Sequence, residues 1–129
     1  MLYMTNIGEF YKCNVCGNFV EVVENGAGEL TCCGQVMELM EIQTEGEKAP
    51  KHAPVVEIDG DKVTVCVGEV QHPMDDDHYI QFIELTVGDE KYLKQLKPGD
   101  EPKATFIVDA DADDVVAKAL CNLHGLWSN

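Results

Sequence analysis

The stretch LTCCGQVMELM, residues 30–40, places two cysteines side by side, and the fold of the N-terminal part of the chain depends on what they bind. A disulfide between Cys32 and Cys33 is disfavoured, because neighbouring Cα atoms lie about 3.8 Å apart and disulfides prefer about 4.4–6.8 Å. Two adjacent thiolates can, however, both reach one metal ion. The remaining ligands of such an ion must then come from elsewhere in the chain.

The upstream stretch YKCNVCG, residues 11–17, supplies them, because Cys13 and Cys16 form a C-x-x-C pair followed by the small residue Gly17. Four thiolates around one ion indicate tetrahedral zinc or iron, and a module this small depends on its metal for folding. Three interpretations of the four cysteines stay open at this point: an iron–thiolate redox centre, a zinc site that only stabilises the fold, and free or disulfide-bonded thiols.

Composition limits the classes of partner. The chain has 129 residues, 45% of them hydrophobic, and a net charge of −15 with nine lysines and no arginine. This charge argues against nucleic acid and against anionic membranes, since phosphate binding needs clustered basic residues. No apolar run approaches the roughly 20 residues of a membrane span, and MLYMTNIGEF does not resemble a secretory signal. We therefore expect a cytoplasmic protein, in which six cysteines favour metal or redox chemistry over disulfides.

Short strands and turns predict an all-β protein with two domains, residues 1–45 and 46–129. Residues 19–24 are expected to form a strand, 36–42 a second strand or an exit segment, and 43–54 a linker loop. Beyond it, the pattern predicts a hairpin of residues 55–58 and 62–67, and strands at 78–87, 91–96 and 103–110. Residues 113–120 fit either a short helix starting at Asp113 or one more strand. Such spacing favours a β-sandwich, with the acidic runs 75–77 and 109–114 in solvated loops.

A second group of metal-ligand types lies in this larger domain. All four histidines of the chain fall at predicted turns or strand ends, and one of them forms a C-x-x-H pair with a cysteine; the group is His52, His72, His78, Cys121 and His124. Five nitrogen and sulfur donors exceed the four that zinc prefers, and suit an octahedral iron with one open position. A thiolate ligand donates electron density to whatever binds the iron, which suits activation of a small oxygen species. Cys66 is interpreted as a packing thiol.

The ordered set C-x-x-C, CC, KHAP, HPM, HYI and CNLHGLW resembles desulfoferrodoxin, the two-iron class of superoxide reductase. The resemblance runs from residue 11 to residue 127, and the order of the motifs is specific although no single one is unique. It implies a desulforedoxin-like module with an Fe(Cys)4 centre, followed by an immunoglobulin-like β-sandwich with a catalytic Fe(His)4(Cys) centre. It also implies a cytoplasmic homodimer that receives electrons from rubredoxin.

Site residues carry over by position. The first iron would be bound by Cys13, Cys16, Cys32 and Cys33. The second would have His52, His72, His78 and His124 as equatorial ligands and Cys121 as the axial thiolate. Lys51 would attract the anionic substrate, because a protein of charge −15 otherwise repels it.

Two positions depart from the family pattern. The family has a glutamate two residues before its first histidine, where it can bind oxidised iron, and this chain has Pro50 there. Glu47 lies three residues earlier, but Pro50 stiffens the intervening loop. We therefore expect water or hydroxide to bind oxidised iron in place of the glutamate, and the catalytic activity to be retained. The family's tryptophan in the central strand is Phe82 here.

The sequence thus predicts one-electron reduction of superoxide to hydrogen peroxide. Two alternatives are a rubredoxin-like electron carrier or non-catalytic metal module, which would leave the histidines without a role, and superoxide dismutation. A thiolate-ligated, exposed iron favours reduction over dismutation.

Overall fold

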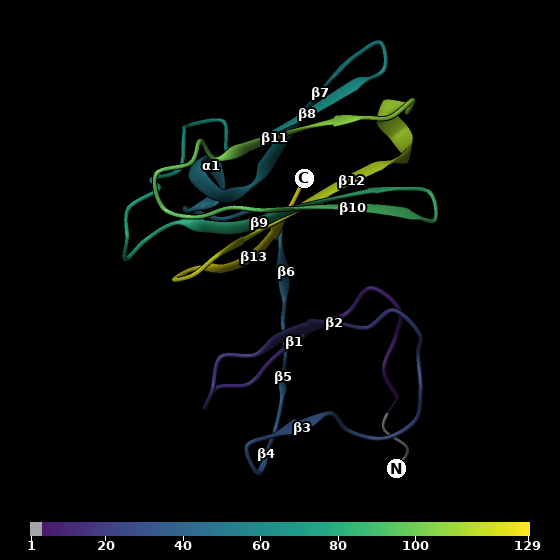
Figure 1. Cartoon of the computed structure of the whole chain (residues 1–129), viewed down its shortest axis with the longest axis vertical. Coiled ribbons are helices and arrows are strands. Elements are labelled where there is room, and N and C mark those ends of the chain that lie inside the picture. The colour runs from purple at the N-terminus through teal and green to yellow at the C-terminus, as the bar shows by residue number, and fades with distance from the viewer. Residues whose placement is uncertain (1–3) are drawn as a thin grey trace. The chain divides into compact units, whose positions relative to one another are not determined.

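The computed structural model describes residues 4–129, which form two compact units that divide between Glu41 and Ile42. Figure 1 shows the order of the strands along the chain. The domain limit predicted after residue 45 stays a prediction, because two compact units do not establish which segments fold alone.

The first unit is a small β module. Strands β1 (Phe10–Lys12), β2 (Phe19–Glu21) and β5 (Glu38–Leu39) form an antiparallel sheet in the order β2-β1-β5. Strands β3 (Thr31–Cys32) and β4 (Gln35–Val36) form a separate hairpin. Few of its described side chains are fully buried, among them Phe10, Cys13 and Met37. So small an apolar core fits a module that a metal stabilises.

The second unit is a sandwich of two antiparallel-rich sheets, which Figure 1 shows as separate layers. One sheet has the order β11-β8-β7, from strands Lys103–Ile107, Lys62–Val67 and Pro54–Asp59. The other has the order β10-β9-β12-β13-β6, from Glu90–Gln95, Ile80–Val87, Val115–Cys121, Gly125–Ser128 and Ile42–Gln43. Its two short helical segments are α1 (Ala49–His52) and the 3₁₀ turn Ala112–Asp114. The all-β fold class is thereby confirmed.

Along β8, buried apolar side chains alternate with side chains on the outer face, and this alternation determines which residues form the core. Val63, Val65 and Val67 are at most 1% exposed and pack in one cluster with Ile83, Leu85, Ala117 and Ala119 of the facing sheet. Burying each valine stabilises the fold by roughly 1.5–3 kcal/mol. Thr64 and Cys66 lie on the opposite face of the strand, as period-two geometry requires.

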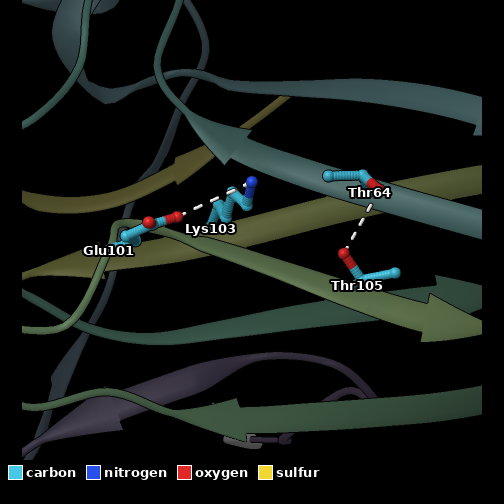
Figure 2. Close-up of polar contacts among 4 residues, drawn as sticks. All are labelled: Thr64, Glu101, Lys103 and Thr105. Carbon is cyan, nitrogen blue, oxygen red and sulfur yellow. Dashed lines mark hydrogen bonds and ion pairs between the residues drawn. The ribbon is translucent and has the colours of Figure 1, made fainter.

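The outer face of this sheet is mostly polar, although Val55 and Ile107 are exposed on it. The Thr64 hydroxyl lies 3.3 Å from that of Thr105 on β11, and Lys103 forms a 3.6 Å ion pair with Glu101 (Figure 2). Cys66 is half-buried there, between Val55 and Lys103 in the sheet register. It lies outside the core cluster, so it packs on the outer face of the sheet.

Several predicted elements were wrong in detail. Residues 43–54 are not a plain loop, because they contain part of β6 and the helix α1. Residues 36–42 divide among β4, β5 and β6, which belong to three different sheets. The strand alternative for 113–120 is the correct one, with the 3₁₀ turn before it, and β13 was not predicted.

Candidate metal centres

Four thiols converge in the first unit. The sulfurs of Cys13, Cys16, Cys32 and Cys33 all lie within 4.8 Å of one another. The Cys16–Cys32 sulfur distance is 3.6 Å and the Cys32–Cys33 distance is 3.9 Å. Ligands about 2.3 Å from a central ion at tetrahedral angles are roughly 3.8 Å apart, so the group fits one tetrahedral metal.

The C-x-x-C turn prepares a thiolate at Cys13. Gly17 has a φ of +83°, a backbone conformation that glycine adopts readily, and its N–H donates to the Cys13 carbonyl at 3.0 Å. The backbone N–H groups of Val15 and Cys16 donate to the Cys13 sulfur at 3.4 Å each. These bonds lower the pKa of the Cys13 thiol to about 6. Cys13 therefore offers a negative sulfur to a cation at neutral pH.

The adjacent pair works because Cys33 has a left-handed backbone. Side chains of successive extended residues point to opposite faces, which would separate the two sulfurs. Cys33 instead has φ +53°, followed by Gly34 at +73°, the two positive angles of a type I′ hairpin turn between β3 and β4. The thiols of Cys16 and Cys32 raise the pKa of Cys33 to about 12, which indicates a crowded sulfur cluster that a cation would relieve.

The structure also brings together the five donors of the second group. His52, His72, His78 and Cys121 have ligand atoms within 4.8 Å of one another. The His52 Nε2 lies 3.1 Å from both the His72 Nε2 and the His124 Nδ1, and the His124 Nδ1 lies 3.8 Å from the Cys121 sulfur. Nitrogens at right angles about 2.1 Å from an ion are roughly 3.0 Å apart, so these spacings fit a shared metal.

Two donors end an element, and the other three lie in the loops and turns between strands. His52 ends α1, His72 and His78 flank the loop before β9, and Cys121 ends β12. His124 lies in the turn that leads into β13. A helix end, a loop, a strand end and a turn of the sandwich thus converge on one point, which the linear sequence does not show.

Gly68 lets the helix approach. A Cβ at residue 68 would lie 2.8 Å from the Pro50 carbonyl oxygen and 3.0 Å from that of Ala53. The Val70 N–H also donates to the Pro50 carbonyl at 2.8 Å. The absence of a side chain at 68 therefore allows the α1 backbone, and with it His52, to pack against the segment after β8.

Hydrogen bonds select the tautomers of the two buried histidines. The Nδ1 of His52 bonds the Lys48 carbonyl at 2.8 Å, and that of His72 bonds the Pro73 carbonyl at 2.6 Å. A carbonyl only accepts, so each Nδ1 carries the hydrogen and each neutral ring presents an Nε2 lone pair. Burial lowers the pKa of His52 and takes that of His72 to about 4, so both rings are neutral at pH 7.

Two lone pairs 3.1 Å apart repel each other unless a cation lies between them. A third nitrogen adds to this: the buried Nε2 of His78 has no hydrogen-bond partner within residues 4–129. Unpartnered buried polar atoms are costly, and three of them facing one point is the signature of a metal site. The group therefore fits an iron ion.

Cys121 is a buried thiol at the same point. Burial raises its pKa, while the backbone N–H groups of Leu123 and His124 oppose the rise by donating to its sulfur. Without a cation the thiol is protonated at neutral pH, whereas a metal ligand is a thiolate. Metal binding at this group consequently releases a proton.

The other predicted residues lie around the helix. Lys51 is exposed on α1, next to the buried His52. Pro50 lies inside α1 and lines a cavity of about 530 Å³ that none of the histidines lines, while Glu47 is exposed in the preceding turn. Phe82 is buried on β9.

Sequence reasoning missed several supporting residues. Burial is the largest cause of the lowered pKa of His52 and of His124, and the positive charge of Lys48 lowers both values further. Lys48 therefore lies near the site. Gln43 and Trp127 both donate to the His124 carbonyl, at 2.8 and 3.1 Å. Trp127 also packs against His52, with ring centroids 5.1 Å apart and ring planes tilted by 31°. Only the proximity of Trp127 to the C-x-x-H pair gave a signal; Gln43 comes from a distant segment.

In the part of the chain that the structure describes, no helix has the length and apolar character that crossing a membrane requires.

Comparison with known proteins identifies both units. Residues 44–129 match the model of the desulfoferrodoxin family, and residues 5–40 match that of the desulfoferrodoxin N-terminal domain. A desulfoferrodoxin homolog of Archaeoglobus fulgidus is 55% identical over 98% of this chain and 99% of its own. The desulfoferrodoxin of Nitratidesulfovibrio vulgaris is 48% identical over 96% and 97%.

Among solved structures, the superoxide reductase of Treponema pallidum superimposes with a TM-score of 0.71 at 34% identity, covering 94% of this chain and 95% of that one. The resemblance seen in the motifs is thereby confirmed over almost the whole length. From its two family matches and its two groups of metal ligands, this chain belongs to the desulfoferrodoxin family.

Proposed function

We propose that this chain is a superoxide reductase, which converts superoxide, one electron and two protons into hydrogen peroxide. The observation that carries the proposal is the convergence of four histidine nitrogens and the Cys121 sulfur, with the lone pairs of His52 and His72 directed at one point. An electron carrier needs only the four-cysteine group and leaves this second group unexplained.

We assign the ligands from this geometry. Cys13, Cys16, Cys32 and Cys33 hold the Fe(Cys)4 centre. The Nε2 atoms of His52, His72 and His78, the Nδ1 of His124 and the Cys121 sulfur hold the Fe(His)4(Cys) centre. The spacings, the fixed tautomers and the unpartnered His78 nitrogen support this set.

Iron held by the second group would supply the electron and a binding site for superoxide. The Cys121 thiolate donates electron density that favours release of the reduced product. Lys51 and Lys48 give the site a local positive charge, which offsets the net charge of −15 and attracts the anion. Water held by the Lys51 ammonium group supplies the protons.

This chain has Pro50 at the position where the family has a glutamate that completes the coordination of oxidised iron. Pro50 lines a cavity that none of the histidines lines, and Glu47 is exposed. The chain would therefore offer oxidised iron no carboxylate at this position, and turnover does not depend on one. Full iron loading without any reaction with superoxide would contradict this view.

The visible absorption spectrum before and after chemical oxidation tests the function. Two ferric–thiolate signatures are expected, one of an all-cysteine centre and one that appears only on oxidation. One peroxide per superoxide is the yield expected of a reductase, whereas dismutation gives half. An all-cysteine signature alone would favour the electron carrier, and a colourless, zinc-loaded protein would make the cysteines a structural site.

The partners and setting are also proposals. We infer a rubredoxin-like electron donor, a homodimer and a cytoplasmic location from the family resemblance. Sedimentation of the iron-loaded protein tests the dimer, and reduction of the oxidised centres by reduced rubredoxin tests the donor. A monomer at micromolar concentration would contradict the first, and no electron transfer the second.

A further inference from the structure

The side chain of Asn122 bonds the backbone on both sides of His78. Its Oδ1 accepts a hydrogen bond from the Tyr79 N–H at 2.9 Å, and its Nδ2 donates to the Asp77 carbonyl at 3.0 Å. The Asn122 backbone N–H adds a third bond, to the Tyr79 carbonyl at 3.2 Å. Because Asn122 directly follows Cys121, these bonds connect two metal-ligand segments that are 43 residues apart in sequence.

His78 needs this support more than the buried histidines do. The rings of His52 and His72 are each oriented by an Nδ1 bond to a backbone carbonyl. Within residues 4–129 the His78 ring has no such bond, and its Nε2 is unpartnered. Its loop is exposed from Asp75 to Asp77, where Asp75 and His78 exchange two backbone hydrogen bonds, and the Ile80 N–H donates to the Met74 Sδ at 3.3 Å. The placement of the ring thus depends on how its backbone is held.

We propose that Asn122 is a positioning residue of the Fe(His)4(Cys) centre: its carboxamide holds the peptide groups beside His78 against the segment that follows Cys121. It thereby fixes the distance between two of the five ligands. The inference rests on the ligand set given under the proposed function, but not on the reaction catalysed there. Outer-shell partners of metal ligands commonly change affinity or activity by about 10–100-fold when they are replaced.

Asn122→Asp is the informative variant, because it keeps the shape and the Oδ1 acceptor while replacing the Nδ2 donor with an oxygen that repels the Asp77 carbonyl. Asn129 provides a matched control in the same unit. Its Oδ1 accepts from the Ala117 N–H at 2.9 Å and its Nδ2 lies 3.4 Å from the Val115 carbonyl, so it bonds both sides of Val116 in the same way. No ligand of either centre is adjacent to Val116.

The experiment loads the full chain with iron and measures release to a chelator, the visible band that appears on oxidation, and the reduction potential of the second centre. We expect Asn122→Asp to release iron from this centre at least tenfold faster and to shift its band and potential. The Fe(Cys)4 band serves as an internal reference and should not change. Asn129→Asp should match the parent in all three measurements.

The proposal would be overturned if the rate of iron release, the visible band and the reduction potential of Asn122→Asp all equalled those of the parent. So would equal effects of Asn129→Asp, because they would show a general loss of stability along β12. Asn122→Ala removes both side-chain bonds; it should release iron at least as fast as Asn122→Asp, and parent-like release from a folded Asn122→Ala protein would also count against the role. A parent that binds iron here but yields no peroxide would refute the reductase function and leave the Asn122 effect measurable.

Discussion

At His52 and His72, two neutral imidazoles turn their lone pairs toward each other at 3.1 Å. Their Nδ1 atoms are committed to backbone carbonyls, so neither ring can donate to the other. Local hydrogen bonding has therefore already selected the tautomers that a metal requires. The sequence identified these residue types and their turn-like contexts, but the tautomers depend on the Lys48 and Pro73 carbonyls, whose positions only the folded backbone sets.

Replacing Lys51 with alanine should slow the second-order reaction with superoxide roughly tenfold, because local positive charge raises anion capture by about 10–10³. The remaining rate should depend less on salt, since screening acts on a charge that is no longer there. Pulse generation of superoxide over a range of ionic strengths measures both. Lys62→Ala, an exposed lysine on β8, is the matched control. An unchanged rate and salt slope in Lys51→Ala would refute its role.

Among the elements, α1 shows most clearly what the sequence could and could not predict. Alternation and turn residues located the hairpin of β7 and β8 and the strands β9, β10 and β11 correctly, because each is a local pattern. The helix was missed since it is only four residues long and begins with Ala49-Pro50 in a polar segment. Its position depends on Gly68, which the sequence shows only as one of 11 glycines.

Strands β6 and β13 were missed for a related reason. β6 is two residues long and pairs in parallel with β13, so it is stabilised by a distant partner and not by its own pattern. The same pairing brings Gln43 to the His124 carbonyl. The metal ligands of the site could thus be predicted from the sequence, whereas the residues that orient these ligands reach the site only through tertiary contacts.

Gly68→Ala should disrupt the second centre selectively. The new Cβ would lie under 3.0 Å from backbone atoms of Pro50 and Lys51, which cannot rotate away, so the α1 backbone and His52 must move. We expect a loss of about 1–3 kcal/mol in the free energy of unfolding of this unit and loss of its iron, with the Fe(Cys)4 band retained. Denaturant unfolding and iron analysis measure these effects.

The control for this prediction is Gly26→Ala, where a Cβ meets no atom within 4 Å. It should change neither the stability of the second unit nor its iron content. Full loading of both centres in Gly68→Ala would show that the close approach is not needed to place His52.

For the molecule as a whole, the histidine cluster couples stability to pH. Burial takes the pKa of His72 from 6.5 to about 4 in the folded state. Because the unfolded chain binds the proton more readily, stability is complete above pH 6.5 and falls as the pH drops toward 4. Each pKa unit corresponds to 1.36 kcal/mol, so roughly 3 kcal/mol is lost over this range.

Urea unfolding of the metal-free protein at pH 7 and at pH 4.5, followed by the emission of the single tryptophan, measures this loss. Trp127 lies in the second unit, so its signal reports that unit. His72→Gln should reduce the pH dependence without abolishing it, since the pKa values of His52 and His124 are also lowered. Equal unfolding free energies at the two pH values would contradict the prediction.

The type I′ turn at Cys33 and Gly34 has a consequence for protein engineering. The three consecutive residues Cys32-Cys33-Gly34 contain two metal ligands and also form the hairpin turn, for which Asn-Gly is a preferred sequence. The segment could therefore be transplanted as a unit. At the tip of another two-residue hairpin that faces a C-x-x-C turn, it would supply two of the four thiolate ligands of a tetrahedral site without lengthening the loop.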